Sequence, residues 1–577
     1  MKIEKRYEGW LNNAQIDPKM KAQLLAMSEA EKEDAFYTDL EFGTAGMRGV
    51  MGAGTNRMNV YTIRKANVGF AKYLLENVKD AKARGVAIAY DSRHFSPEFA
   101  LESAKVLATH GIKTYVFEDV RPTPELSFAV RHLNCAGGIV ITASHNPPEY
   151  NGYKIYDESG CQTLPEEGDK VIAGVNAVEN VFDIQVETEE NLRAQGLIVD
   201  IGKEIDALYL ARILELEIRP DMDKSKLKLV FSPLHGTAGT LTSDLLSRSG
   251  YTNVHLVESQ YQPDSKFPTV NYPNPEDPAA FAMAIELGKK VGADVLLATD
   301  PDADRMGVAV KKSMEDSDED YVLLTGNQTG AVMVEYLLSG RKKTGTLPAQ
   351  GRVFDTIVSS ELAANIARSY GMQCQSTLTG FKFIGEQIRL MEASDVEYVY
   401  GYEESYGSLV GDFVRDKDAL QAVLILAEAA AYYKAQGKTL WHVLNELYEI
   451  HGHYEEDLAN IALAGKEGAD KIKKILADFR ATPPTNVAGL SVVVVEDYQT
   501  QKRYEVQEQK ESPIELPASN VLKYYLEDGS WFALRPSGTE PKAKVYMSVV
   551  SENSTQTKKR LEAIKKDVLK RVDEILT

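Results

Sequence analysis

Short apolar runs that alternate with longer amphipathic stretches constrain the fold of this chain more than any other feature. The run VAIAY at 86–90 is followed by the amphipathic stretch PEFALESAKVLATHG and then by TYVFE at 114–118. The same alternation surrounds KLVFS at 228–232, DVLLAT at 294–299 and EYVYGY at 397–402. Strands that alternate with helices of this length predict α/β units on largely parallel sheets.

The C-terminal part follows a different pattern. VVVVEDYQTQKRYEV and KYYLEDGSWFALR predict strands joined in hairpins, and TQTKKRLEAIKKDVLKRVDEI predicts a closing helix. The 577 residues are enough for roughly four domains. We therefore predict α/β units followed by a smaller C-terminal α+β domain. We place the domains at 1–203, 204–322, 323–450 and 451–577.

Charge and cysteine content narrow the class of protein. A net charge of −20 argues against a non-specific binder of nucleic acid or of anionic membranes. No stretch approaches the ~18 apolar residues of a membrane helix, and the N-terminus lacks the apolar core of a signal peptide. Cys135, Cys161 and Cys374 form no CxxC pair, so we expect a reducing, cytoplasmic compartment.

Four polar loops each follow an apolar strand, which is where ligands bind in open α/β sheets. The first, TASHNP at 142–147, places Ser144 beside His145, and Lys154 follows nearby. A serine hydroxyl is a poor nucleophile unless a base or a metal assists it. The simpler interpretation of a lone Ser-His pair is an ordinary Asx/Pro turn.

The second loop carries Asp300, Asp302 and Asp304 at alternate positions. Three carboxylates on one side of a loop repel one another without a cation between them, and hard oxygen ligands suit magnesium or calcium. An EF-hand is excluded, because Arg305 stands at the sixth position and Lys311 at the twelfth. Arg305 indicates a phosphate contact beside the metal. A solvated acidic turn is the alternative.

The third loop, GYEESYG at 401–407, offers Glu403 and Ser405, whose side chains suit hydrogen bonds to sugar hydroxyls. Arg415 and Lys417 follow shortly. A glycine-bounded turn with exposed acids would explain the same residues.

The fourth loop combines a guanidinium, two hydroxyls and free backbone N–H groups on a tight turn. This pattern predicts a phosphate cradle at Arg535, Ser537, Gly538 and Thr539. A proline-rich hairpin turn is the alternative.

A further stretch, Gly437-Lys438-Thr439, is similar to the end of a P-loop. Tyr432 stands where that motif needs its first glycine, so no Walker A motif is present.

Together and in this order, the loops resemble those of the α-D-phosphohexomutase superfamily. The resemblance runs from FGTAGMRG at 42–49 to the Arg535 loop, nearly the whole chain. It implies an α/β fold in which three α/β/α domains with mixed sheets and a smaller C-terminal α+β domain surround one deep central cleft. Each domain would give one loop to the cleft.

The resemblance also implies residue roles. It places the catalytic phosphoserine at Ser144, with His145, Arg48 and Lys154 as active-site neighbours, and Mg²⁺ on Asp300, Asp302, Asp304 and an oxygen carried by Ser144. It implies substrate contacts at Arg305, Thr379, Gly380, Lys382, Glu403, Ser405, Lys417, Arg535, Ser537, Gly538, Thr539 and Lys544. The family usually has arginine where this chain has Lys544, and lysine keeps the charge but loses bidentate geometry.

The implied reaction interconverts glucose 1-phosphate and glucose 6-phosphate, with glucose 1,6-bisphosphate as intermediate and activator. Mannose or pentose phosphates as substrates, synthesis of glucose 1,6-bisphosphate, simple phosphatase action and a non-catalytic sugar-phosphate-binding role remain alternatives. We expect a small sugar phosphate as partner, no nucleic acid and no membrane, and a monomer or weak homodimer.

Overall fold

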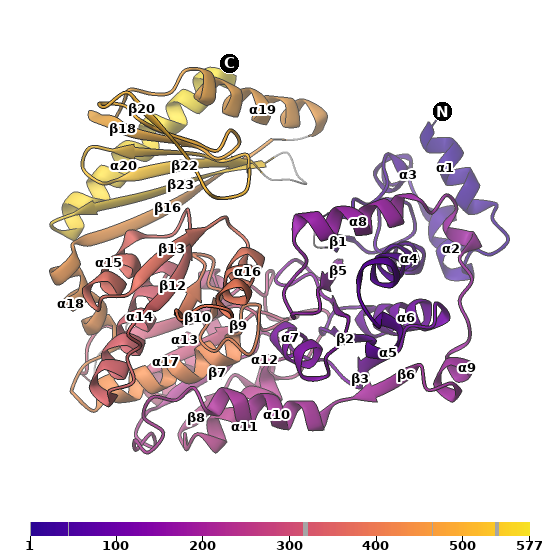
Figure 1. The fold of residues 1–577 in the computed structure, drawn as a ribbon, viewed down its shortest axis with the longest axis horizontal. Coiled ribbons are helices and arrows are strands. Elements are labelled where there is room, and N and C mark those ends of the chain that lie inside the picture. The colour runs from indigo at the N-terminus through magenta and orange to yellow at the C-terminus, as the bar shows by residue number, and fades with distance from the viewer. Residues whose placement is uncertain (1, 44–45, 316–320, 464, 537–541, 577) are drawn as a thin grey trace. The chain divides into compact units, whose positions relative to one another are not determined.

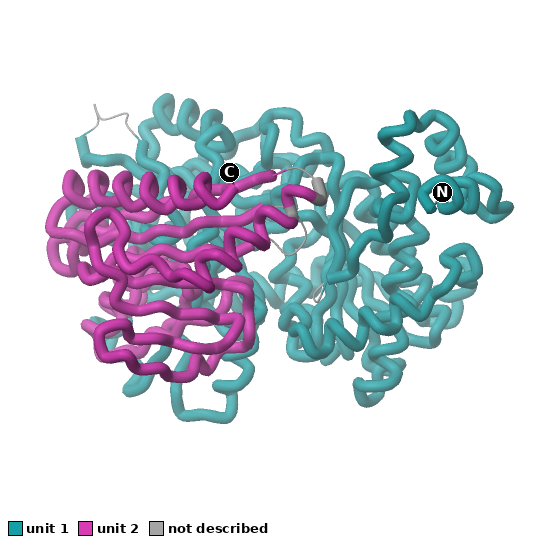
Figure 2. The backbone as a smooth tube through the Cα atoms, turned by 90° about the horizontal axis from the view of Figure 1, so that it is seen from above, with its two compact units in different colours: residues 1–329, 340–352, 381–441 teal, residues 330–339, 353–380, 442–577 magenta. Residues whose placement is uncertain are grey.

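The computed structural model describes residues 2–43, 46–315, 321–463, 465–536 and 542–576. The chain divides into two compact units, coloured separately in Figure 2, and each is described by itself. Unit 1 contains residues 1–329, 340–352 and 381–441, and unit 2 contains residues 330–339, 353–380 and 442–577.

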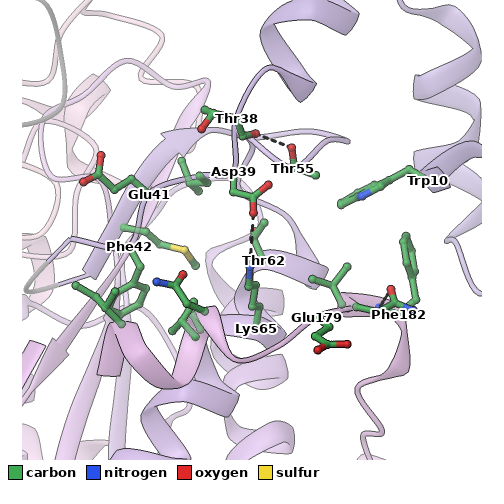
Figure 3. Close-up of a pocket in the computed structure, with 18 of the residues that line it drawn as sticks. Trp10, Thr38, Asp39, Glu41, Phe42, Thr55, Thr62, Lys65, Glu179 and Phe182 are labelled. Carbon is green, nitrogen blue, oxygen red and sulfur yellow. Dashed lines mark hydrogen bonds and ion pairs between the residues drawn. The ribbon is translucent and has the colours of Figure 1, made fainter. Parts of the chain in front are cut away.

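Unit 1 begins with three helices, α1 (Lys2–Leu11), α2 (Pro18–Ala26) and α3 (Glu29–Phe36) (Figure 1). Ser28 and Glu31 form a reciprocal capping box at the start of α3, which satisfies two N–H groups at the helix start. The Trp10 indole packs edge-on against the rings of Phe36, Tyr61 and Phe182. A cavity of about 730 Å³ lies beside this aromatic cluster (Figure 3).

The first sheet of unit 1 is mixed, with strand order β1-β5-β4-β2-β3-β6. Strand β2 pairs in parallel with β3 and β4, whereas β5 pairs antiparallel with β4 and β1. The predicted strand VAIAY is β2. The elements are β1 (Gly46–Val50), α4 (Val60–Asn77), α5 (Ala81–Arg84), β2 (Val86–Tyr90), α6 (Ser96–Thr109), β3 (Thr114–Phe117), α7 (Thr123–His132), β4 (Gly137–Ile141), β5 (Tyr150–Tyr156), α8 (Pro165–Asn176), η1 (Val181–Asp183), α9 (Glu189–Ala194) and β6 (Ile198–Ile201).

The second sheet of unit 1 is also mixed, with strand order β11-β10-β9-β7-β8. Strand β7 pairs in parallel with β8 and β9, and β10 turns back antiparallel to β9. The turn between β9 and β10 is the predicted acidic loop. The elements are α10 (Lys203–Leu214), β7 (Leu229–Ser232), α11 (Gly239–Arg248), β8 (Val254–Leu256), α12 (Glu258–Tyr261), η2 (Pro278–Phe281), α13 (Ala282–Val291), β9 (Val295–Thr299), β10 (Met306–Lys311) and β11 (Tyr321–Leu323).

Unit 1 is completed by α16 (Phe381–Met391), β14 (Glu397–Tyr402), β15 (Ser408–Leu409) and α17 (Ala419–Lys434). Strand β14 is the predicted EYVYGY run, and it pairs antiparallel with β15 across the third polar loop. Helix α17 is buried along most of its length and packs against β9 and β10. The chain passes between the units in α14 (Gly326–Thr344), β12 (Gly351–Thr356) and α18 (Leu440–His451).

Unit 2 contains α15 (Glu361–Ser369), β13 (Gln373–Thr377) and an antiparallel sheet with strand order β16-β23-β22-β21-β18-β19-β20. Both predicted hairpins are confirmed, because β18 pairs with β19 and β21 pairs with β22. The predicted closing helix is α20, which packs on β16 and β23. The elements are β16 (His453–Ala462), α19 (Gly465–Ala481), β17 (Asn486–Val487), β18 (Leu490–Asp497), β19 (Lys502–Glu505), β20 (Lys510–Pro513), β21 (Leu522–Leu526), β22 (Trp531–Pro536), β23 (Lys542–Ser551) and α20 (Ser554–Leu576).

Within the described residues, none of the helices combines the length and the apolar character that crossing a bilayer requires.

Replacing Trp10 with alanine should reduce the stability of the N-terminal helices by about 3–5 kcal/mol, because the indole is buried among three aromatic rings. Faster hydrogen exchange of the amides in α1 and α3 would report the loss. Leu25→Ala is the control, because Leu25 is 67% exposed on α2 and its loss should change stability by no more than about 0.5 kcal/mol. Equal exchange rates in both variants would contradict the packing.

Candidate active site

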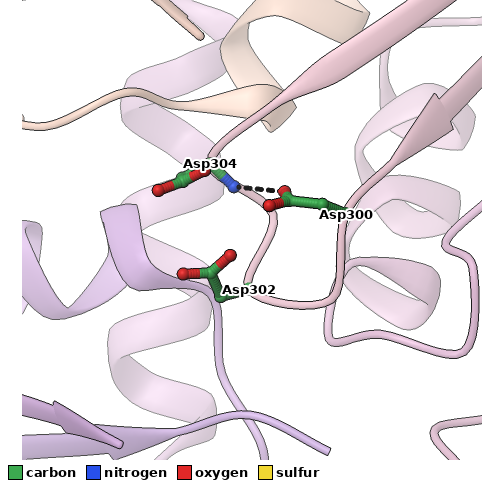
Figure 4. A group of neighbouring side chains, drawn as sticks. All are labelled: Asp300, Asp302 and Asp304. Atoms are coloured by element: carbon green, nitrogen blue, oxygen red, sulfur yellow. Dashed lines mark hydrogen bonds between the residues drawn. The ribbon is translucent and has the colours of Figure 1, made fainter. Parts of the chain in front are cut away.

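Three buried aspartates converge in the turn between β9 and β10 (Figure 4). One carboxylate oxygen from each of Asp300, Asp302 and Asp304 lies within 4.8 Å of the other two. The turn is closed by Asp300, whose Oδ1 accepts the N–H groups of Asp304 at 3.1 Å and Arg305 at 3.0 Å. The predicted grouping of the three carboxylates is therefore present.

Two lysines from distant parts of the sequence face these carboxylates. Lys154 Nζ lies 2.9 Å from Asp302 Oδ2, and Lys417 Nζ lies 3.1 Å from Asp304 Oδ2. Burial, together with the charges of Asp302 and Asp304, raises the pKa of Asp300 well above its ordinary value. Burial acts in the same direction on Asp302, but the Lys154 ammonium outweighs it and the pKa of Asp302 is lowered. A guanidinium adds to the two ammonium groups, because Arg305 Nε lies 3.8 Å from Asp304 Oδ1.

Two carboxylate oxygens of the three aspartates are suited to act as ligands of a cation. Within the described part of the chain, Asp302 Oδ1 and Asp304 Oδ1 are buried and accept no hydrogen bond. A buried carboxylate oxygen without a hydrogen bond is costly, and Arg305 Nε approaches only one of the two, Asp304 Oδ1, at 3.8 Å. An all-oxygen donor set of carboxylates is typical of Mg²⁺ or Ca²⁺ sites.

Ser144 is held directly against this triad. It lies in the loop between β4 and β5 with φ +50°, and its Oγ donates a hydrogen bond of 2.7 Å to Asp300 Oδ2. His145 Nδ1 lies 3.1 Å from the same Oγ. Burial and then the nearby Arg305 and Arg48 guanidinium groups lower the pKa of His145 well below its ordinary value. Its imidazole is therefore held in the neutral form near pH 7, in which one ring nitrogen can accept a hydrogen bond.

The serine loop rests on a buried arginine that the sequence analysis did not single out. The Asp91 carboxylate lies 3.3 Å from Arg93 Nε and accepts a hydrogen bond of 2.7 Å from Thr142 Oγ1. The same Thr142 oxygen accepts the N–H of Ser144 at 2.8 Å. The sequence contains a pattern that could have indicated these residues, because the polar stretch Asp91-Ser92-Arg93 directly follows the strand VAIAY. The Arg93 guanidinium donates to four backbone carbonyl groups of the loop, those of Ser144, Asn146, Pro147 and Tyr150.

Two further residues that the sequence analysis left out support the metal loop. Thr123 donates its N–H to the Asp302 carbonyl at 2.9 Å and its hydroxyl to Asp302 Oδ2 at 3.0 Å. Asp416 accepts hydrogen bonds from the Tyr156 hydroxyl at 2.7 Å and from Lys417 Nζ at 3.1 Å. Thr123 is the first residue of α7, and Asp416 lies three residues before the start of α17, positions that sequence alone does not distinguish from an ordinary helix start or turn.

Arg48 and Arg305 add positive charge beside Ser144. Arg48, on β1, donates to the Asn146 side chain at 2.9 Å, within the serine loop. Arg305 forms an ion pair with Glu276 and a β-bridge with Gly407, so the metal loop and the third polar loop lie side by side.

Lys417 is shared by the metal loop and the third polar loop. Burial opposes its charge, but Asp304, Asp416 and Glu403 outweigh the burial and raise the pKa of Lys417. Ser405 lies on the same loop as Glu403, two residues before Gly407. The structure thus brings together the residues predicted on three of the four polar loops.

The remaining predicted residues are only partly placed. Lys382 lies in the first turn of α16, where its carbonyl accepts from Cys161 Sγ at 3.4 Å. Arg535 and Lys544 face each other across β22 and β23 in unit 2, which also contains Thr379 and Gly380. The predicted phosphate contacts Ser537, Gly538 and Thr539 lie outside the described residues.

Four family models match the chain in order. They are the phosphoglucomutase/phosphomannomutase alpha/beta/alpha domain I at residues 39–181, domain II at 207–313, domain III at 325–451 and the C-terminal domain at 458–570. The four-domain α/β architecture predicted from the sequence is therefore confirmed.

Curated relatives agree with the family models. A phosphoglucomutase of Staphylococcus epidermidis is 39% identical over 519 residues, covering 90% of this chain and 92% of the relative. A phosphoglucomutase of Staphylococcus aureus is 38% identical over 558 residues, covering 96% of this chain and 98% of the relative. In its fold, the chain is similar to the crystal structure of a putative phosphomannomutase from Thermus thermophilus, with a TM-score of 0.68 and 23% identity. The match covers 93% of this chain and 99% of that structure.

Replacing Arg93 with lysine should slow the sugar-phosphate turnover expected from the sequence roughly tenfold to a hundredfold. An ammonium cannot reach four carbonyl groups together, and each buried acceptor left unsatisfied costs about 1–3 kcal/mol. We expect the loss in kcat more than in KM, because Arg93 orients the Ser144 loop.

Arg84→Lys is the matched control, because the Arg84 guanidinium also donates to backbone carbonyl groups but contacts no residue of the serine loop. Equal kcat values for the two variants would show that Arg93 does not position Ser144.

Proposed function

The chain belongs to the phosphoglucomutase/phosphomannomutase family and is a phosphohexomutase, and we propose that it interconverts glucose 1-phosphate and glucose 6-phosphate. The observation that supports the proposal most directly is the 2.7 Å contact between Ser144 Oγ and Asp300 Oδ2. It brings a hydroxyl that can carry a phosphoryl group to a carboxylate cluster suited to a divalent cation. The phosphoglucomutase names of the near full-length relatives favour glucose over mannose or pentose.

In the proposed reaction, Ser144 carries the phosphoryl group. The bond between phosphorus and Oγ breaks as the free hydroxyl of a hexose monophosphate forms a new P–O bond and gives up its proton. The resulting glucose 1,6-bisphosphate then returns its other phosphoryl group to Oγ. His145 Nδ1 lies within hydrogen-bond reach of Oγ, the geometry that a group exchanging a proton there requires.

We propose that Asp300, Asp302, Asp304 and an oxygen on Ser144 hold Mg²⁺. When bound there, the ion neutralises charge on the transferring phosphoryl group. Lys154 and Lys417 fix the orientation of the carboxylates through their ion pairs.

The remaining assignments are part of the same proposal. Glu403 and Ser405 would bind sugar hydroxyls. Phosphate and sugar positioning would fall to Arg48, Arg305, Thr379, Gly380, Lys382, Lys417, Arg535, Ser537, Gly538, Thr539 and Lys544. We keep the domain boundaries given by the sequence, a monomer or weak homodimer, and a cytoplasmic location, which the unpaired state of Cys135, Cys161 and Cys374 supports.

Phosphorus NMR on the purified protein tests the reaction. With magnesium, a trace of glucose 1,6-bisphosphate and glucose 1-phosphate, we expect rapid conversion to glucose 6-phosphate with little inorganic phosphate. Mannose 1-phosphate and ribose 1-phosphate should react more slowly. Ser144→Ala should lower the rate at least ~1000-fold, because it removes the group that carries the phosphoryl.

Other outcomes would point elsewhere. Faster turnover of mannose or ribose phosphate would change the substrate and keep the mechanism. Release of inorganic phosphate would indicate a phosphatase. No reaction in a folded protein would favour a binding protein.

Replacing Asp302 with asparagine should weaken binding of Mn²⁺, used as a spectroscopic substitute for Mg²⁺, at least ~100-fold. Loss of even outer-shell partners of a metal costs ~10–100-fold in affinity, and Asp302 offers a buried oxygen that accepts no hydrogen bond among the described residues. Electron paramagnetic resonance of free Mn²⁺ measures the affinity. Asp221→Asn is the control, because Asp221 is exposed in the same part of the chain. Unchanged Mn²⁺ binding by Asp302→Asn would place the metal elsewhere.

A further inference from the structure

A donor and an acceptor of opposite charge lie beside each other in the metal loop without a hydrogen bond between them. Arg305 Nε and Asp304 Oδ1 are both buried, and within the described part of the chain neither forms a hydrogen bond. The two atoms are 3.8 Å apart, beyond the ~2.7–2.9 Å of a charge-assisted hydrogen bond. Leaving both groups unsatisfied is costly, which indicates that another contact of the guanidinium competes with this one.

Glu276 makes the competing contact. Its Oε1 accepts a hydrogen bond from Arg305 Nη1, in an ion pair whose arginine side chain is 20% exposed and whose glutamate side chain is 32% exposed. Partial burial strengthens a charge-assisted bond of this kind relative to one in water. Because a guanidinium is planar and rigid, a bond that holds Nη1 also fixes the position of Nε. Glu276 and Asp304 thus act on the same guanidinium, and Glu276 is the one that forms the hydrogen bond.

The turn that carries Glu276 is packed against β10. Asn274 Oδ1 accepts the Glu276 N–H at 3.1 Å. The residue between them, Pro275, packs on Gly307, where an added Cβ would lie only 2.6 Å from the Pro275 carbonyl oxygen. Arg305 lies two residues before Gly307, and residues two apart in an extended chain face the same side. The backbone of the turn therefore places Glu276 on the side of β10 from which the Arg305 side chain extends.

The guanidinium that Glu276 holds lies beside the candidate nucleophile. Its charge contributes to lowering the pKa of His145, whose Nδ1 lies 3.1 Å from Ser144 Oγ. The Arg305 N–H donates to Asp300 Oδ1 at 3.0 Å, so this residue is part of the metal loop itself. Since no described residue accepts a hydrogen bond from Arg305 Nε, this N–H is available to a bound ligand. A phosphate oxygen is an acceptor that suits an arginine.

We propose that Glu276 is a positioning residue that holds Arg305 away from Asp304, so that Asp304 Oδ1 stays available to a divalent cation and Arg305 Nε to a phosphate oxygen. The inference rests on the proposed function, because it concerns how the metal and the substrate phosphate meet their ligands. Without Glu276, the guanidinium would turn toward the adjacent Asp304 carboxylate and form the hydrogen bond that is now missing. Glu276 would act only through Arg305.

Mn²⁺ binding in a double-mutant cycle tests this role without any turnover. Mn²⁺ again substitutes for Mg²⁺, and electron paramagnetic resonance of free Mn²⁺ gives the affinity. We expect Glu276→Ala to weaken Mn²⁺ binding at least ~10-fold, because Arg305 then competes with the metal for Asp304 Oδ1. In protein that already carries Arg305→Ala, the same change at Glu276 should have no further effect.

Two further variants separate positioning from loss of charge and from loss of fold. Glu276→Gln keeps an oxygen that can accept from Arg305 Nη1, so its Mn²⁺ affinity should lie well above that of Glu276→Ala. Glu397→Ala, on β14, breaks an ion pair of the same kind, to Arg341 on α14 at 2.8 Å, and should bind Mn²⁺ like the parent. Thermal unfolding of each variant checks that the fold is kept.

Turnover of glucose 1-phosphate supplies a second readout. Glu276→Ala should lower kcat/KM at least ~10-fold, because a misplacement of about 1 Å in a positioned group can cost ~100-fold in rate. The loss should again be absent when Arg305→Ala is already present, and Glu276→Gln should recover most of the activity.

Three outcomes would overturn the inference. Equal losses of Mn²⁺ affinity with and without Arg305 would show that the Glu276 charge acts through space or on the fold. Tighter binding of Mn²⁺ by Glu276→Ala would show that Glu276 obstructs the site. A parent that binds no Mn²⁺ would remove the proposed metal site as well.

Failure of the proposed function gives a different result. If the Mn²⁺ cycle is as expected but the parent does not convert glucose 1-phosphate, the proposed reaction is wrong and the role of Glu276 toward the metal site stands.

Discussion

The burial of three carboxylates in one short turn is the constraint on which the rest of the site depends. Asp300, Asp302 and Asp304 are removed from water, so their mutual repulsion must be offset locally. Lys154 comes from β5 and Lys417 from the segment before α17, and both ammonium groups reach the turn. These two ion pairs still leave buried carboxylate oxygens without hydrogen bonds among the described residues. Such oxygens suit the coordination of a divalent cation.

This electrostatic requirement also explains why the serine loop lies where it does. Ser144 reaches Asp300 only because the β4–β5 loop of the first sheet extends to the β9–β10 turn of the second. Thr123 joins the same two regions through two hydrogen bonds to Asp302. Arg93 holds the serine loop by its backbone carbonyl groups. The Ser144 hydroxyl is thus held beside the carboxylates that suit a cation. The guanidinium groups of Arg48 and Arg305 add positive charge nearby, which favours a phosphate group.

The sequence by itself determined the α/β class, the strands VAIAY and EYVYGY, the C-terminal hairpins and the acidic loop, because apolar periodicity and residue type at strand ends are local properties. Motifs led it to predict a site at Ser144 and the three aspartates, which the structure places next to one another. It did not identify Arg93, Thr123 or Asp416, since an arginine that binds carbonyls 50 residues away has no local signature. Only the tertiary structure decided that Lys154 and Lys417 meet the same turn. These contacts depend on how separate sheets pack, which no sequence spacing specifies.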